Sequence, residues 1–254
     1  MTDQAFVRED SVLKEVLGCI RRADKDFSLI DPGDTVLVGV SGGKDSLLLL
    51  YAMALYRKFC PNKYTLLAAT LHMGREPFDL SPIQRLCDEL EVPYTVKMTQ
   101  ISQVVFEERK EANPCSLCAK MRRGALIDLC KELGANKLAL GHHRDDALET
   151  LLLSMLYEGR IHTFHPKTFL SRSGVTQIRP MAYLPEKHVI HMVKTLSLPV
   201  VSNPCPANGL TKRENMKEIL DNICKTIPNA RELMLSALQN EEQYGLWNRK
   251  PKNG

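Results

Sequence analysis

The most informative part of this sequence is Val36-Leu-Val-Gly-Val-Ser-Gly-Gly-Lys-Asp-Ser46. Residues 36–40 form a short, mostly β-branched apolar run, which is typical of a buried strand in a parallel sheet. The glycine pair after it lets the backbone turn tightly and bring its N–H groups close to an oxyanion. A helix is expected from about residue 46, so its positive N-terminal end adds to the charge of Lys44. The stretch therefore predicts a phosphate-binding turn between a strand and a helix.

The turn differs from a Walker A loop, which needs the pattern G-x-x-x-x-G-K-[ST]. Here the glycine pair directly follows Ser41, and Asp45 stands beside Lys44. The hydroxyls of Ser41 and Ser46 can donate hydrogen bonds to phosphate oxygens. We expect one nucleotide-binding loop made of Ser41, Gly42, Gly43, Lys44, Asp45 and Ser46. An ordinary glycine-rich turn is the weaker alternative, because the matching residues stand in the correct strand-to-helix context.

Strand and helix patterns alternate on both sides of this loop. Further strands are expected at 64–72, 93–98, 137–141, 176–180 and 199–202. Helices are expected at 10–30, 46–58, 81–90, 145–157, 186–196 and 212–241 and within 114–133, with Ser81 as an N-cap before Pro82. The alternation predicts βαβ units, and so an α/β fold with a parallel twisted sheet flanked by helices. The segment 159–175, rich in basic and turn residues, is expected to be a mobile loop.

The length of 254 residues allows one large α/β domain with a small appendage. We expect an N-terminal helical segment at 1–30, a nucleotide-binding α/β domain at 31–203, and a helical C-terminal extension at 204–254. No apolar run approaches the roughly 20 residues that span a bilayer, and the N-terminus lacks a secretory signal pattern. These features predict a cytoplasmic protein without a membrane partner.

The charge of the chain permits an anionic partner without requiring one. The formal net charge is +4 and the isoelectric point is about 8.6. The basic residues near the motifs are Arg122, Arg123, Arg160, Lys167, Arg172, Arg179, Lys212 and Arg213. A basic rim around a site suits a polyanion such as nucleic acid, although a solvated surface explains the same residues equally well.

Three of the eight cysteines are candidates for chemistry. The other five lie singly within helical patterns and are expected to be small buried residues: Cys19, Cys60, Cys87, Cys130 and Cys224. Pro114-Cys-Ser-Leu-Cys118 holds a CxxC pair, which fits half a zinc site, a redox pair or part of an iron–sulfur site. Cys205 lies between two prolines after an expected strand.

Three thiolates, from Cys115, Cys118 and Cys205, fit a [4Fe-4S] cluster that leaves one iron without a protein ligand. Such an iron can bind a sulfide and present it as a nucleophile. A zinc ribbon would need a second CxxC or a histidine pair. The remaining alternative is a pair of unligated thiols.

A second polar motif, Gly141-His-His-Arg-Asp-Asp146, follows the strand expected at 137–141. Ligands of parallel sheets bind at the carboxyl ends of the strands, where this motif and the loop at 41–46 both fall. The side chains of His142, His143, Arg144 and Asp145 can contact ribose, phosphate or Mg²⁺. Asp145 and Asp146 also favour a helix N-terminus. We expect a ligand-binding role for Asp145, and the role of Asp146 is open.

Together these motifs resemble the PP-loop ATP pyrophosphatases, and within them the tRNA 2-thiocytidine synthetases. The resemblance covers roughly residues 10–240 in the same motif order. It rests on SGGKDS at 41–46, PCSLCAKMRRGAL at 114–126, LGHHRDDALET at 140–150, IRPMAYLPEK at 178–187 and NPC at 203–205. The segment Leu71–Pro77 differs from the acidic, glutamine-containing sequence of that family.

The resemblance implies an enzyme that uses ATP to adenylate the C2 oxygen of a cytidine, number 32 of the tRNA anticodon loop, and replaces that oxygen with sulfur. It implies catalytic roles for Lys44 and Asp45, with Asp45 holding Mg²⁺ beside the pyrophosphate of ATP. It implies a [4Fe-4S] cluster on Cys115, Cys118 and Cys205, and an ATP and substrate cleft lined by Gly141, His142 and Asp145. A cysteine desulfurase would supply the sulfur, and homodimers are familiar among relatives.

Other functions remain open from the sequence. The CxxC pair could carry a persulfide without a cluster, or the enzyme could act on another base or a small molecule. An ATP pyrophosphatase that attaches an amine would not need the clustered cysteines. A non-catalytic nucleotide- or RNA-binding module would need neither the thiols nor the charged pair Lys44 and Asp45.

Overall fold

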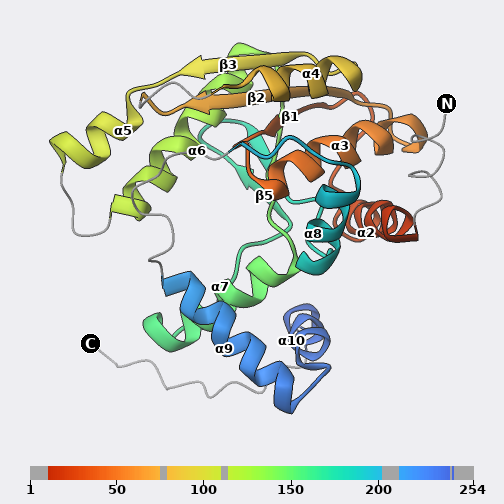
Figure 1. The fold of residues 1–254 in the computed structure, drawn as a ribbon, viewed down its shortest axis with the longest axis vertical. Coiled ribbons are helices and arrows are strands. Elements are labelled where there is room, and N and C mark those ends of the chain that lie inside the picture. Colours follow the sequence, from red (N-terminus) through yellow and green to blue (C-terminus); the bar gives the residue numbers. More distant parts are fainter. Residues whose placement is uncertain (1–10, 75–78, 110–113, 202–211, 241, 243–254) are drawn as a thin grey trace. The chain divides into compact units, whose positions relative to one another are not determined.

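The structure is a computed structural model that describes residues 11–74, 79–109, 114–201, 212–240 and 242. It contains a six-stranded sheet with the strand order β3-β2-β1-β4-β6-β5 (Figure 1). The strands are β1 (Thr35–Gly39), β2 (Thr65–His72), β3 (Tyr94–Met98), β4 (Lys137–Ala139), β5 (Lys167–Leu170) and β6 (Val175–Ile178). Neighbouring strands are parallel except β5 and β6, which form an antiparallel hairpin. The predicted α/β fold is confirmed, with one antiparallel edge strand added.

The helices of the described residues follow the expected alternation. They are α2 (Ser11–Phe27), α3 (Lys44–Phe59), α4 (Ser81–Glu89), α5 (Ile101–Gln103), the π-helical turn η1 (Val104–Glu108), α6 (Pro114–Glu132), α7 (Arg144–Glu158), α8 (Glu186–Thr195), α9 (Lys212–Thr226) and α10 (Ala230–Gln239). The helix expected at 212–241 is divided in two, and α5 and η1 were not expected. None of these helices is long and apolar enough to cross a membrane.

Three local predictions are wrong. The segment 159–175 contains β5, which pairs with β6 and is therefore not a loop throughout. Residues 199–201 form no strand, although Val201 contacts the loop after β1 through a backbone hydrogen bond. Ser81 is the first residue of α4 and not its N-cap; the Asp79 carboxylate accepts its N–H at 2.8 Å and its hydroxyl at 3.1 Å.

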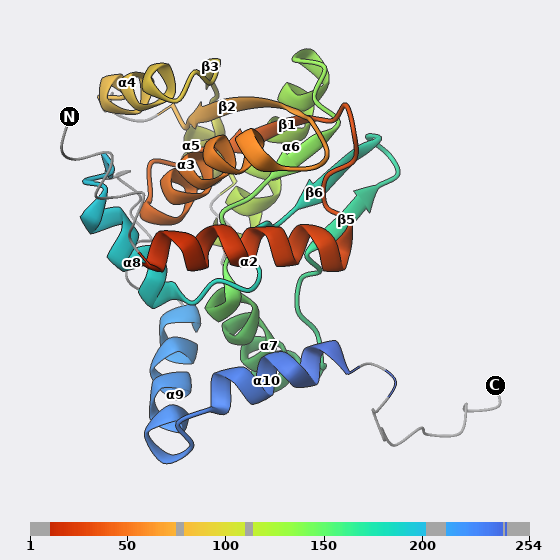
Figure 2. The ribbon, with the colours of Figure 1, turned by 90° about the vertical axis from the view of Figure 1, so that its right-hand side faces the viewer.

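The apolar pattern of β1 explains how the sheet is covered on both faces. Side chains alternate between the two faces of a strand. Leu37 packs in a buried cluster with Leu126 and Leu129 of α6. A Cβ added to Gly39 would lie 3.2 Å from Cδ1 of Leu126, so α6 packs closely against the end of β1. The even-numbered residues face the other side of the sheet, where α2, α3 and α8 pack together (Figure 2).

The chain forms two compact units, residues 1–147 with 164–211 and residues 148–163 with 212–254. The first unit holds the whole sheet. In the second, the later part of α7 packs with α9 around the buried side chains of Leu148, Leu152, Met216 and Leu220. The domain boundaries expected after residues 30 and 203 stay predictions.

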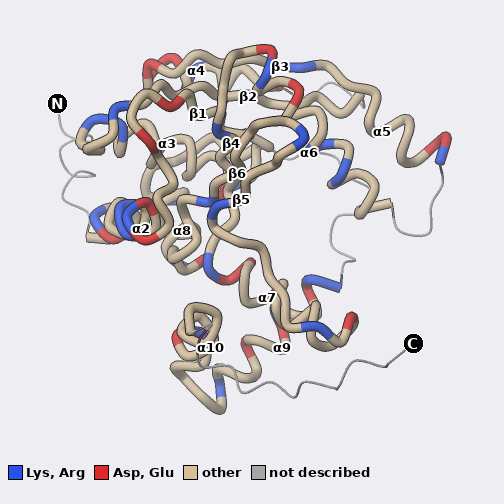
Figure 3. The backbone as a smooth tube through the Cα atoms, turned by 180° about the vertical axis from the view of Figure 1, so that it is seen from behind, with Lys and Arg blue, Asp and Glu red and all other residues tan. Residues whose placement is uncertain are grey.

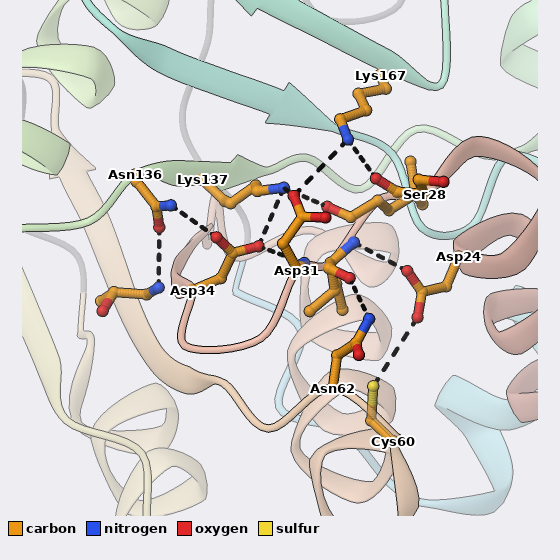
Figure 4. Close-up of polar contacts among 12 residues, drawn as sticks. Asp24, Ser28, Asp31, Asp34, Cys60, Asn62, Asn136, Lys137 and Lys167 are labelled. Atoms are coloured by element: carbon orange, nitrogen blue, oxygen red, sulfur yellow. Dashed lines mark hydrogen bonds and ion pairs between the residues drawn. The ribbon is translucent and has the colours of Figure 1, made fainter.

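A network of polar contacts lies at the amino end of the sheet, around the first residue of β4 (Figure 4). Lys137 begins β4 and is only 3% exposed. Its ammonium lies 2.8 Å from a carboxylate oxygen of Asp31 and 3.0 Å from one of Asp34, and donates to the backbone oxygen of Leu29 at 2.9 Å. The hydrogen bond from Lys137 lowers the pKa of Asp31. Every donor of this buried ammonium therefore has a protein acceptor.

Candidate active site

The loop between β1 and α3 holds its shape through its own two serines. The Ser46 hydroxyl donates to the backbone oxygen of Gly43 at 3.0 Å and accepts the N–H of Ser41 at 3.0 Å. The two hydroxyl oxygens lie 3.2 Å apart. The helix begins at Lys44, two residues earlier than expected, so the N-terminal turn of α3 is part of the loop. The binding of phosphate by Ser41 and Ser46 stays a prediction.

Gly42 is required by the geometry of this turn. Its φ is +86°, a left-handed conformation that side chains other than glycine rarely adopt. Its backbone oxygen accepts the N–H of Val201 at 3.0 Å, and an added Cβ would lie 3.2 Å from the Val201 oxygen. The segment after α8 thus contacts the loop through Val201. The sequence predicted a sixth strand in this segment.

Gly141 brings the end of β4 against the same loop. A Cβ at this position would lie 3.0 Å from both the carbonyl carbon of Asp45 and the nitrogen of Ser46. Backbone atoms of a helix N-terminus cannot move aside easily, so no larger side chain fits. The two motifs that the sequence placed at one edge of the sheet are therefore in direct contact.

Lys44 lies between two carboxylates. Its ammonium donates to Asp45 Oδ1 at 2.7 Å and lies 3.1 Å from Glu186 Oε1 at the start of α8. Burial lowers the pKa of Lys44, but the hydrogen bonds to and the negative charges of Asp45 and Glu186 outweigh burial and leave the pKa raised. The side chain is about one-third exposed, at 33%. Glu186 was not predicted as a site residue, although it stands in the motif IRPMAYLPEK.

His143 connects Asp45 with the start of α7. Its Nε2 lies 3.5 Å from Asp45 Oδ1 and 3.5 Å from Asp146 Oδ2. Its backbone N–H donates to Asp146 Oδ2 at 2.9 Å, while its Nδ1 accepts the N–H of Asp146 at 3.4 Å. This reciprocal pair is a capping box with histidine at the N-cap. Asp146, whose role was open, therefore stabilises the start of α7.

Asp145 has a structural contact that the sequence did not predict. Its Oδ2 accepts the N–H of Glu186 at 2.9 Å, at the beginning of α8, and its Oδ1 lies 3.5 Å from Arg144. The carboxylate is well placed to stabilise the positive end of α8. Its expected contact with nucleotide stays a prediction. His142 lies beside Phe164, with 5.0 Å between ring centroids.

The described cysteines differ in how far their side chains are exposed to solvent. Cys60, Cys87 and Cys130 are buried as predicted, whereas Cys19 and Cys224 are only partly buried. Burial raises the pKa of both Cys87 and Cys130 to about 12. Cys115 is exposed and Cys118 partly exposed, both in the first turns of α6.

The first turns of α6 lie beyond the carboxyl ends of the strands, because α6 leads into β4 and its Leu126 packs at the end of β1. Cys205 lies outside the described residues. Among the described residues, no three Cys, His, Asp or Glu side chains are grouped closely enough to hold a metal ion.

The residues of the expected basic rim are distributed over both units, and the rim itself stays a prediction. Lys167 donates to the backbone oxygen of Ser28 in the network of Figure 4, and Arg172 lies in the β5–β6 hairpin at the amino end of β6. Arg160, Lys212 and Arg213 belong to the second unit. Arg122 and Arg123 on α6, and Arg179 after β6, remain at the carboxyl end of the sheet; basic positions along α6 are visible in Figure 3.

Comparison with known proteins agrees with this arrangement. The model of the PP-loop domain family matches residues 19–222. A tRNA-cytidine(32) 2-sulfurtransferase of Pelobacter propionicus is 35% identical over 240 residues, which cover 93% of this chain and 89% of the relative. One of Geobacter metallireducens is 36% identical over 239 residues, 93% of each chain. This chain belongs to the PP-loop family of the tRNA-cytidine(32) 2-sulfurtransferases.

A solved structure outside this group of relatives supports the same family. The U34-tRNA thiolase NcsA from Methanococcus maripaludis, determined with its [4Fe-4S] cluster, superimposes with a TM-score of 0.75 at 25% identity, covering 94% of this chain and 81% of that chain. The PP-loop match includes every candidate site residue, Cys205 among them.

Proposed function

We propose that the protein is an ATP-dependent tRNA sulfurtransferase that replaces the C2 oxygen of cytidine 32 with sulfur. The observation that carries this proposal is the 35% identity to tRNA-cytidine(32) 2-sulfurtransferases over nearly the whole of both chains. The joined loop of 41–46 and Gly141–Asp146 supports it, because adenylation of a carbonyl needs a phosphate-binding loop beside an acceptor site.

The residues of the loop have distinct tasks in this reaction. The N–H groups at the start of α3 and the ammonium of Lys44 bind the phosphates of ATP and stabilise the charge that develops as pyrophosphate leaves. Asp45 would hold Mg²⁺, which would neutralise part of the pyrophosphate charge. Glu186 and Asp45 orient the Lys44 ammonium, since both lie within 3.1 Å of it. Transfer of AMP to the base oxygen makes that oxygen a good leaving group.

The cysteines of α6 fit a cluster by their chemistry. Cys115 and Cys118 are one helical turn apart and accessible, whereas buried thiols with a raised pKa do not readily become thiolate ligands. They would hold a [4Fe-4S] cluster together with Cys205. When bound, the cluster would supply an iron without a protein ligand at which sulfur can be held for transfer.

The partners follow from the same proposal. The substrate is tRNA, recognised at its anticodon loop, and the sulfur comes ultimately from a cysteine desulfurase. We further propose a cytoplasmic enzyme that can form a homodimer and has no membrane partner.

The experiment that tests the function is expression of this chain in a bacterium that lacks its own 2-thiocytidine activity. Mass spectrometry of the purified tRNA should then find 2-thiocytidine at position 32, and the strain with an empty vector should have none. Thiolation of another base, or of none, would contradict the proposal.

The cofactor proposal has a separate test. Protein purified without oxygen should be brown and contain about four irons per chain. Cys115→Ser, Cys118→Ser and Cys205→Ser should each lose most of this iron, while Cys87→Ala, which alters a buried cysteine of α4, should keep it. Colourless wild-type protein that still thiolates tRNA would favour persulfide chemistry on the CxxC pair.

A further inference from the structure

One of the basic residues near the motifs, Arg179, is buried at the carboxyl end of the sheet. Arg179 directly follows β6 and is only 7% exposed. Its Nη1 donates to the backbone oxygen of His165 at 2.6 Å. Its Cζ lies 4.8 Å from the ring centroid of Phe164, and that ring also lies 5.0 Å from the ring of His142 in the polar motif after β4. The ring of Phe164 therefore contacts both Arg179 and His142 of the candidate active site.

The charge of Arg179 has no counter-charge within the described part of the chain. No Asp or Glu there forms an ion pair with it, and its Nε is buried without a hydrogen-bond partner. The helix α6, which carries Arg123, contacts β6, which Arg179 directly follows. Burial, and then the positive charge of Arg123, lower the pKa of Arg179 to about 10. Arg123 itself is exposed on α6.

Such an arrangement is costly unless an anion completes it. An uncompensated buried charge destabilises a fold, and a second like charge adds to the cost. Arginine is the residue that proteins favour for binding phosphate, because the guanidinium offers several donors in one plane. The bare geometry thus favours an anionic ligand at this edge.

The position of the pair favours a phosphate of RNA over one of ATP. Arg179 follows β6, two strands away from β1 and its loop, which is about 10 Å at the usual strand spacing. Arg123 stands five residues after Cys118 on α6, or about 7.5 Å along the helix axis. If a tRNA base reaches Cys115 and Cys118, the RNA backbone on either side of that base would lie near the turn of α6 that carries Arg123.

We propose that Arg179 and Arg123 together bind a backbone phosphate of the tRNA strand beside the base that is modified. The inference deepens the proposed function and rests on it. Phe164 covers one face of the Arg179 guanidinium and His165 holds one of its donors, so the arginine is fixed in place before RNA arrives. Fixing it beforehand reduces the entropy lost on binding.

The test is the affinity of the full-length protein for an unmodified tRNA transcript containing cytidine 32, measured over a range of salt concentrations. Arg179→Gln should weaken tRNA binding roughly ten- to hundred-fold, and Arg123→Gln, at an exposed position, roughly three- to five-fold. Each should lower the slope of log K against log salt by about one phosphate contact. ATP affinity should stay within about two-fold of wild type.

Arg172→Gln is the matched control, because it removes an arginine from the same hairpin at the opposite end of β6. It should leave tRNA binding unchanged. Arg179→Lys keeps a charge but not the planar fork, and should bind tRNA with intermediate affinity. If Arg179→Gln does not fold, Arg123→Gln decides the question alone.

Each outcome separates the two proposals. Wild-type tRNA affinity in both Arg179→Gln and Arg123→Gln would overturn the phosphate subsite and leave the proposed function standing. Loss of ATP binding with normal tRNA binding would overturn it too, by assigning the arginine to the nucleotide. Arg179-dependent tRNA binding by a protein that forms no 2-thiocytidine would support the subsite and contradict the function. A wild-type protein that binds no tRNA would overturn both.

Discussion

Two buried cations at opposite ends of the same pair of strands have opposite surroundings. Lys137, at the amino end of β4, has two carboxylates and a backbone oxygen within 3.0 Å. Arg179, at the carboxyl end of β6, has a backbone oxygen, an aromatic ring and a second arginine near it. Lys137 lies opposite Thr176, only three residues before Arg179. The two cations therefore belong to neighbouring strands of one sheet but have different roles.

This difference distinguishes charged side chains that stabilise the fold from charged side chains that are placed to bind a ligand. A buried charge is tolerated when protein groups satisfy it, as at Lys137. At the carboxyl end, Arg179 has no carboxylate partner among the described residues, and Lys44, although paired with Asp45 and Glu186, is one-third exposed. Stability should therefore depend on the amino end of the sheet, and catalysis and binding on the carboxyl end.

The largest effect is expected from Lys137→Met. The substitution leaves the buried carboxylate of Asp34 without its cation, which should lower the free energy of unfolding by about 3–5 kcal/mol. Thiolation per folded molecule should hardly change at low temperature. Urea denaturation checks the first statement, with Lys131→Met, exposed on α6, as the control. An inactive but fully stable Lys137→Met protein would contradict a purely structural role for Lys137.

Lys44→Met should show the reverse pattern. The loss of one charged donor from the phosphate site should slow thiolation about 10²–10³-fold, or about 3–4 kcal/mol of transition-state stabilisation. The melting temperature should stay close to that of wild type. Lys58→Met, in the last turn of the same helix, is the control and should keep full activity. Normal single-turnover rates for Lys44→Met would remove this residue from the mechanism.

Gly141→Ala changes the contact between two motifs at the carboxyl end of the sheet without changing any charge. The added Cβ would meet backbone atoms of Asp45 and Ser46 at 3.0 Å, so the loop must shift. We expect a loss of about 1–3 kcal/mol in stability and weaker ATP binding in calorimetry. Gly124→Ala on α6 has no atom within 4 Å of its Cβ and should instead stabilise the protein by about 0.5–1 kcal/mol. Equal effects of the two substitutions would contradict close packing at Gly141.

The smallest effect is expected from Asp146→Ala. Removal of the carboxylate from the capping box with His143 should cost about 0.5–2 kcal/mol of stability in thermal melts. Asp146→Asn keeps an acceptor oxygen and should retain most of that stability. If Asp146→Asn abolished thiolation while remaining fully stable, Asp146 would have a chemical role beyond capping.

The fold around the phosphate loop could be predicted from the sequence because local signals agree there. An apolar run, a glycine pair and a helical pattern all indicate one strand–turn–helix, and the structure places β1 and α3 on it. Burial of Cys60, Cys87 and Cys130 followed equally well from their helical context.

What the sequence missed depends on contacts between distant segments. Glu186 reaches Lys44 only because α8 packs beside α3. Asp145 caps a helix that begins 41 residues later, and no local pattern encodes that contact. The strand β5 lacks a clear apolar alternation and is specified by its hairpin partner β6. Likewise, the sequence does not reveal that Arg179 lacks a carboxylate partner among the described residues, because this depends on which residues surround it in space.

The most direct test of the central claim is the coupling of ATP use to thiolation in purified protein. Matched tRNA transcripts with cytidine or uridine at position 32 would be incubated anaerobically with reconstituted enzyme, ATP and a sulfide source. One AMP should form for each 2-thiocytidine, with the cytidine transcript alone, and Lys44→Met should form both products about 10²–10³-fold more slowly. Sulfur transfer without AMP, or AMP formed equally with both transcripts, would contradict it.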